Sequence, residues 1–179
     1  KGFSEAWMHH KGRNRHHYEY WTDLSPVTRC YEPVEMPRKY LVEMVMDRIA
    51  ACKESLVKLA EIGRRNDAII AVEDLPRSCL GNHHSDILKL IGEDPTLGVC
   101  FDTNHLLSLE KPHEYIRKIG NKIVTLHVSD YDFLDERHWL PGEGQIDWAM
   151  LKNTLKSVGY AGCWLYELGL GGSDWTIDR

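Results

Sequence analysis

Four apolar segments of the sequence each end in a side chain that can bind a metal ion. In chain order these end residues are Glu73, Asp102, His127 and Glu167. Three carboxylates and one imidazole suit a hard or borderline divalent ion such as Mn2+, Zn2+, Co2+ or Mg2+. Such an ion can polarise a carbonyl and an adjacent hydroxyl oxygen, while a neighbouring carboxylate moves a proton at the next carbon. The series therefore predicts a site for one divalent ion and acid–base chemistry.

Other polar side chains lie close to this series in the sequence. His105 follows Asp102 by three residues and could bind substrate, bind a second metal ion, or pack and cap a loop. In the glycine- and proline-containing loop after His127, Arg137 could bind a sugar oxygen or a phosphate, and His138 could add a ligand. Farther along that segment, we expect Asp147 to cap a helix and Trp148 to pack.

The sequence around these residues alternates between two hydrophobic patterns, one typical of buried strands and one typical of amphipathic helices. Runs that are apolar on both faces predict strands at 68–73, 97–102, 122–128 and 162–167. Amphipathic spacing predicts four helices, at 37–62 with a stop at Gly63, at 85–91 with Ser85 as the N-cap, at 112–119 and at 147–158. This alternation predicts an α/β fold with a parallel sheet covered by helices.

The ligands' place at strand ends favours a (β/α)8 TIM barrel, where chemistry occurs at the carboxyl ends of the strands. A complete barrel has about 250 residues, whereas this chain has 179 and begins with Lys1. We therefore expect a fragment that holds the C-terminal half or more of the barrel. We treat residues 1–179 as one partial barrel domain, in which residues 1–37 are mostly irregular, with a short strand near 8–10.

Composition narrows the class of partner. The net charge is −5, which predicts no general attraction to nucleic acid or to an anionic membrane. No apolar run approaches the ~20 residues of a membrane-spanning helix, and five cysteines without a CxxC pair favour a reducing, cytoplasmic location. We expect Cys100 and Cys163 to be small buried hydrophobic residues. The pair His83 and His84 precedes a helix and could simply be exposed.

Five motifs resemble the xylose isomerase-like TIM-barrel superfamily. They are VEDLP at 72–76, GVCFDTNH at 98–105, LHVSD at 126–130, RH at 137–138 leading to PGEGQIDW at 141–148, and YE at 166–167. The resemblance covers about residues 40–170. The superfamily includes sugar-phosphate isomerases and epimerases, ketose 3-epimerases, hydroxypyruvate isomerase, inosose dehydratase and endonuclease IV.

The resemblance implies that Glu73, Asp102, His127 and Glu167 hold one catalytic divalent ion. In the epimerase branch, the residues that match Glu73 and Glu167 also form the acid/base pair, one on each face of the substrate carbon. It further implies that His105 and Arg137 contact substrate oxygens, and we add His138 to this substrate-binding set.

The leading hypothesis is a metal-dependent isomerase or epimerase of a sugar or sugar phosphate, acting through a metal-stabilised enediolate. Three alternatives stay open: a dehydratase of the same superfamily, a zinc-dependent AP endonuclease like endonuclease IV, and a non-catalytic barrel fragment. In endonuclease IV an Asp-Arg-His loop supplies additional zinc ligands, and here Glu136 replaces that Asp. We expect a small-molecule partner, no nucleic acid and no membrane, and self-association that covers the open edge of a half-barrel.

Overall fold

The computed structural model describes residues 13–15, 17, 20–76, 79, 81–106 and 110–169. The chain forms two compact units, Lys1–Cys52 and Lys53–Arg179. Helix α2, at Arg38–Arg65, contributes its first residues to one unit and its last turns to the other. Each unit is considered by itself, and the prediction of a single domain over residues 1–179 remains a prediction. No helix in the described ranges is long and apolar enough to cross a membrane.

The first unit contains an antiparallel hairpin. Strands β1 (Thr22–Leu24) and β2 (Tyr31–Pro33) pair with Leu24 opposite Tyr31, and both strands are exposed. The expectation of a mostly irregular segment over residues 1–37 was therefore wrong for these residues. Their strands are three residues long and bury neither face, so they lack the hydrophobic alternation that marks a strand in a sequence. The strand expected near residues 8–10 lies outside the described residues.

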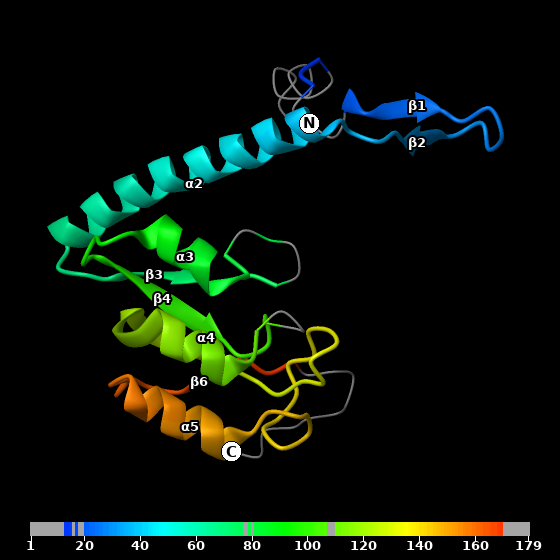
Figure 1. Cartoon of the computed structure of the whole chain (residues 1–179). Helices are drawn as coiled ribbons and strands as arrows, with labels where there is room; N and C mark the ends of the chain where they lie inside the picture. Colours follow the sequence, from blue (N-terminus) through cyan, green and yellow to red (C-terminus); the bar gives the residue numbers. More distant parts are fainter. Residues whose placement is uncertain are drawn as a thin grey trace, which may run out of the picture. The chain divides into compact units, whose positions relative to one another are not determined.

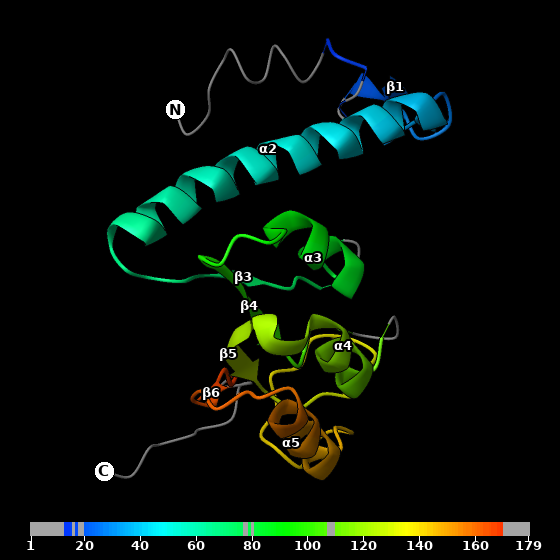
Figure 2. The same ribbon diagram turned by 60° about the vertical axis from the view of Figure 1, so that its left-hand side comes forward.

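The second unit is built on a four-stranded parallel sheet. Its strands, in spatial order, are β3 (Ile70–Glu73), β4 (Leu97–Asp102), β5 (Ile123–Val128) and β6 (Leu165–Tyr166). The spatial order is the chain order, so each strand lies beside the next one along the sequence (Figures 1 and 2). Such an arrangement is what successive βα units of a barrel wall produce. The predicted α/β class and parallel sheet are confirmed.

Three helices follow the strands and pack in the same order, as two views show (Figures 1 and 2). They are α3 (His84–Ile91), α4 (Pro112–Ile119) and α5 (Trp148–Ser157). Side chains alternate along β4, and the Phe101 ring stacks on Tyr115 of α4 with centroids 5.4 Å apart. Because neighbours on a strand point to opposite faces, Cys100 and Asp102 face away from the helices, toward the side where the metal-ligand candidates lie.

The predicted stop of one helix and the predicted N-cap of another differ from the structure. Helix α2 continues through Gly63 to Arg65. Gly63 is instead a packing position, since a Cβ there would lie 2.6 Å from Cγ2 of Thr96. Helix α3 is capped by His83 rather than Ser85, because Nδ1 of the His83 ring accepts a hydrogen bond from the Ser85 backbone N–H.

The last predicted strand is shorter than its apolar run. Only Leu165–Tyr166 pair with β5, and both residues are about half exposed. Cys163 is exposed, so the expectation that it is buried was wrong, whereas Cys100 is buried as predicted. In the described residues β6 pairs with β5 only, and a strand with one paired edge buries less of its surface.

Candidate metal centre

The sheet brings the four predicted ligands together. Glu73 ends β3, Asp102 ends β4, His127 lies in β5 opposite Asp102, and Glu167 follows β6 directly. One ligand atom from each of the four lies within 4.8 Å of the others. Parallel strands end at one edge of their sheet, so residues separated by 94 positions (73 to 167) meet there.

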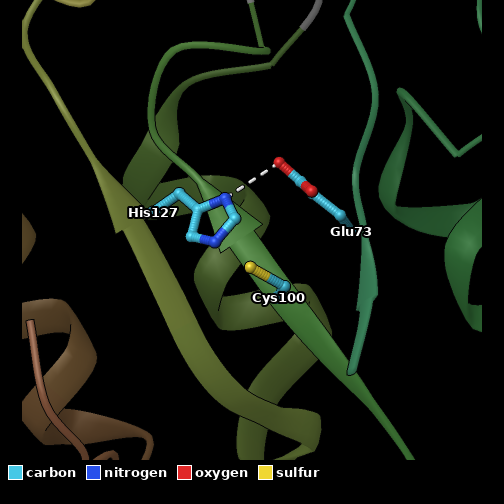
Figure 3. A group of neighbouring side chains, drawn as sticks. All are labelled: Glu73, Cys100 and His127. Carbon is cyan, nitrogen blue, oxygen red and sulfur yellow. Dashed lines mark hydrogen bonds and ion pairs between the residues drawn. The ribbon is translucent and has the colours of Figure 1, made fainter. Parts of the chain in front are cut away.

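The His127 ring lies at the centre of the cluster. Its Nδ1 is 3.0 Å from Oε1 of Glu73, 2.9 Å from Oε2 of Glu167 and 3.9 Å from Oδ2 of Asp102. Figure 3 shows Glu73 and His127 pointing toward one another across β4, with the Cys100 side chain beside them. Three carboxylates around one imidazole nitrogen form a strongly anionic group, which a divalent cation would stabilise.

Asp102 is the most buried member of the cluster. Its Oδ1 accepts a 2.7 Å hydrogen bond from the Asn104 N–H, while Oδ2 is buried without a hydrogen-bond donor. Burial raises the pKa of Asp102 to about 6, against the opposing charge of His105. A buried carboxylate oxygen that lacks a donor usually has another partner, and a bound cation would be one.

Asp74, whose role the sequence analysis missed, holds the strand end that carries Asp102. It is fully buried, and its Oδ1 accepts a 2.7 Å hydrogen bond from the backbone N–H of Asp102. Burial raises the pKa of Asp74 well above its usual range, against the lowering effect of that hydrogen bond. Its position next to Glu73 was the available signal, but burial of a carboxylate cannot be read from the residue type.

Cys100 faces the same space as the four candidates. Its thiol forms a second possible ligand group with Glu73 and His127, in which the ligand atoms also lie within 4.8 Å of one another. Burial, followed by the charges of Glu73 and Asp74, raises the pKa of this thiol to about 12. In the absence of a cation Cys100 is therefore a neutral thiol beside the four candidates.

His105 lies at the border of the cluster. Its Nδ1 donates a 2.6 Å hydrogen bond to the carbonyl oxygen of Asp74, which fixes the ring. The opposite nitrogen, Nε2, lies 3.5 Å from Oδ2 of Asp102 and 3.7 Å from Oε1 of Glu136. This places the free edge of the ring beside the metal-ligand candidates.

Arg137 and His138 are held by the protein itself. The Arg137 Nε donates a 2.9 Å hydrogen bond to Asp132, and its guanidinium lies 5.7 Å from the centre of the Trp139 ring. His138 has a left-handed backbone with φ of 53°, and its Nδ1 donates a 3.2 Å hydrogen bond to the carbonyl of Glu167. His138 thereby ties the loop to the segment that carries Glu167, and substrate contact by either residue stays a prediction.

Asp130 organises the loop after β5. This buried carboxylate accepts hydrogen bonds of 2.8–3.1 Å from four N–H groups, those of Tyr131, Gly142, Ile146 and the Trp148 indole. Burial alone would raise the pKa of Asp130, but the hydrogen bonds from Trp148, Gly142 and Ile146 oppose it and the pKa is lowered. Trp148 was expected only to pack, so its hydrogen bond is an addition, while Asp147 caps α5 as predicted by accepting from the Met150 N–H.

The sequence matches one family profile and is similar to proteins of other organisms. Residues 28–173 match the profile of the family described as Xylose isomerase-like TIM barrel. An uncharacterized protein of Methanocaldococcus jannaschii is 30% identical over 115 residues, which are 60% of this chain and 39% of that protein. The 3-oxo-isoapionate decarboxylase of Pectobacterium atrosepticum is 32% identical over 82 residues, which are 40% of this chain and 30% of the enzyme.

Solved structures give the same fold. A D-tagatose 3-epimerase-like protein superposes with a TM-score of 0.63 and 27% identity, over 75% of this chain and 52% of that protein. The IolI protein, solved with a bound zinc atom, has a TM-score of 0.57 and 21% identity, over 67% of this chain and 47% of its own. The chain thus spans about half the length of these proteins or less, as a partial barrel should.

Proposed function

Because the chain belongs to the Xylose isomerase-like TIM barrel family, we propose that it is part of a divalent-metal-dependent isomerase or epimerase of a sugar or sugar phosphate. The observation that carries this proposal is the meeting of Glu73, Asp102, His127 and Glu167 at one edge of the sheet. The similarity to a D-tagatose 3-epimerase-like protein supports the substrate class.

The residues present fit a divalent ion. Glu73, Asp102, His127 and Glu167 would hold it through carboxylate oxygens and one imidazole nitrogen, a donor set suited to Mn2+, Co2+, Zn2+ or Mg2+. The buried, undonated Oδ2 of Asp102 supports this assignment. The zinc bound by IolI supports a divalent cation in this fold. When bound, the ion would polarise a substrate carbonyl and an adjacent hydroxyl oxygen.

Two carboxylates of the cluster are placed to move protons. Glu73 comes from the first strand of the sheet and Glu167 follows the last, so they approach the cluster from opposite sides. Both side chains are accessible, with exposed fractions of 34% and 49%. In the proposed reaction one carboxylate removes the proton next to the carbonyl, and the other returns a proton to the opposite face, which inverts that carbon.

In this proposal the side chains around Glu73 and Glu167 orient the substrate. His105, with Nδ1 held by the Asp74 carbonyl, presents Nε2 toward the cluster and would bind a substrate hydroxyl. Arg137 lies on the loop that is joined to the Glu167 carbonyl by a hydrogen bond from His138. It would bind a sugar oxygen or a phosphate in place of its present hydrogen bond to Asp132.

The test is exchange of substrate hydrogen with solvent. The chain, loaded with Mn2+, is incubated in D2O with D-tagatose or D-fructose, and NMR follows the C–H group next to the carbonyl. The proposal expects deuterium at that carbon, with or without net epimerisation, because proton removal precedes product formation. Absence of exchange across a panel of ketoses and their phosphates would count against it.

A lyase reaction is the second candidate, and one relative favours it. The similarity to the 3-oxo-isoapionate decarboxylase, at 32% identity, raises the prospect that the same cluster stabilises the enolate left by loss of carbon dioxide. The same NMR experiment, run also with a sugar acid, separates the two, since a lyase releases carbon dioxide or water from the sugar acid and leaves a simple ketose unchanged.

A further inference from the structure

We infer a second divalent-cation site, formed by His83, His84 and Glu110. One ligand atom from each residue lies within 4.8 Å of the others. Nε2 of His83 is 3.5 Å from Oε1 of Glu110, and Nδ1 of His84 contacts the same oxygen directly. The histidines lie at the start of α3 and Glu110 lies just before α4. No residue is shared with the Glu73 cluster, so the inference does not depend on the proposed function.

The carboxylate of Glu110 is held in position for this role. Its Oε2 accepts a 3.0 Å hydrogen bond from the backbone N–H of His84, and its side chain is only 11% exposed. The other oxygen, Oε1, is thereby turned toward both imidazole rings, whose centroids are 4.2 Å apart. Glu110 also lines a pocket of about 390 Å³.

The His83 ring has a partner for its second nitrogen. Nδ1 lies 2.9 Å from the Ser85 hydroxyl oxygen and 3.2 Å from the Ser85 backbone nitrogen. When Nε2 binds a cation, a neutral ring carries its proton on Nδ1, which then donates to the hydroxyl and no longer accepts from the backbone. Metal-binding histidines commonly donate their other N–H in this way. Ser85 can therefore hydrogen-bond to Nδ1 of His83 with or without a bound cation. Its backbone N–H donates when no cation is bound, and its hydroxyl accepts when one is.

The donor set also predicts which ion binds. Two imidazoles and one carboxylate suit Zn2+, Co2+ or Ni2+, with a water molecule in a further position. The Glu73 cluster, with three carboxylates, is the harder site and accepts Mn2+ or Mg2+ more readily. An ion at the second site would connect the segment before α3 to the segment before α4.

Metal stoichiometry in matched variants tests this site. Glu73→Ala/His127→Ala removes two ligands of the first cluster, and the variant is equilibrated with Zn2+, dialysed and analysed for metal. We expect one equivalent of zinc per chain. Adding Glu110→Gln, or separately His84→Ala, should weaken zinc binding at least 10-fold. His113→Ala is the control, since it removes a histidine near the start of α4 that is outside the trio.

Two results would overturn the inference: a Glu73→Ala/His127→Ala chain that binds no zinc, or full zinc retention after Glu110→Gln. A measurement on the unmodified chain guards against misfolded variants. On titration with Zn2+, the NMR signals of the His83 and His84 rings should shift together and stop changing by two equivalents, when both sites are filled, while those of His113 stay in place. Failure of the two rings to respond would equally contradict the site.

Discussion

Oδ1 of Asp74 accepts a 2.7 Å hydrogen bond from the backbone N–H of Asp102. A buried carboxylate at the end of β3 thus fixes the strand end that carries a metal-ligand candidate on β4. The carbonyl of the same Asp74 accepts the 2.6 Å bond from His105. One residue that would touch neither metal nor substrate therefore orients two that would.

Substitution of Asp74 tests this positioning role. Asp74→Ala should weaken Mn2+ binding by about 10- to 100-fold, the range typical of lost outer partners, because the Asp102 N–H loses its acceptor. Asp74→Asn should retain most of the affinity, since its amide oxygen can accept the same bond. Isothermal titration with Mn2+ measures both, and equal loss in the two variants would contradict the argument.

Glu167 offers the sharpest test of the acid/base assignment. Glu167→Gln should lower the rate of deuterium exchange by about 10²- to 10⁴-fold, the usual contribution of a positioned acid or base. The fold should persist, because this side chain is 49% exposed. Exchange is measured at saturating Mn2+, with the exposed Glu114→Gln as the control. A rate near that of the unmodified chain would remove Glu167 from the mechanism.

Mn2+ content tests the cluster independently of any substrate. After reconstitution and removal of loosely bound ions, elemental analysis should find about one Mn2+ per chain, lost in Glu73→Ala and in His127→Ala. The reason is that each variant removes one of the four converging ligands. With Zn2+ we expect two equivalents, the second sensitive to Glu110→Gln. A second zinc that depended on Glu136 or His138 instead would favour the endonuclease-like alternative.

Asp130 should stabilise the fold in a pH-dependent way. Oδ2 of Asp130 accepts hydrogen bonds from the Gly142 N–H and the Trp148 indole N–H. In Asp130→Asn an amide NH₂ group can take the place of that oxygen, and it cannot accept these bonds. We therefore expect the free energy of unfolding to fall by about 2–4 kcal/mol. The folded pKa is lowered from 3.8, so the stabilisation is present above that value and disappears as the pH falls through the folded pKa. Urea unfolding at pH 6 and pH 3 should therefore show a smaller difference at pH 3.

Gly98 and Val124 should behave as a coupled pair. A Cβ at Gly98 would lie 2.5 Å from Cγ1 of Val124, and its three nearest heavy-atom neighbours would all belong to that side chain. Gly98→Ala should therefore destabilise the protein by about 1–3 kcal/mol through overpacking. In the Val124→Ala background the same change should cost much less, because the clashing methyl groups are gone. A double-mutant cycle by thermal or urea unfolding gives the coupling, and strict additivity would refute the contact.

Much of the second unit follows from local pattern. The strand at Leu97–Asp102 and the helix at Pro112–Ile119 have the predicted bounds, because a doubly apolar run and a Pro-to-Gly amphipathic segment are unambiguous signals. The hairpin of the first unit and the passage of α2 through Gly63 escaped prediction. Short exposed strands carry no periodic signal, and a glycine needed for close packing looks in sequence like one that ends a helix.

The four metal-ligand candidates could be identified from the sequence, because each ends an apolar run, and parallel strands of one sheet place such ends at one edge. The neighbours that support them became visible in the folded chain. Asp74 accepts a hydrogen bond from the Asp102 backbone N–H. Asp130 accepts hydrogen bonds from N–H groups of its own loop. Glu110, just before α4, contacts His83 and His84 at the start of α3. Those relationships depend on burial and on contacts between distant segments, which residue type and spacing do not encode.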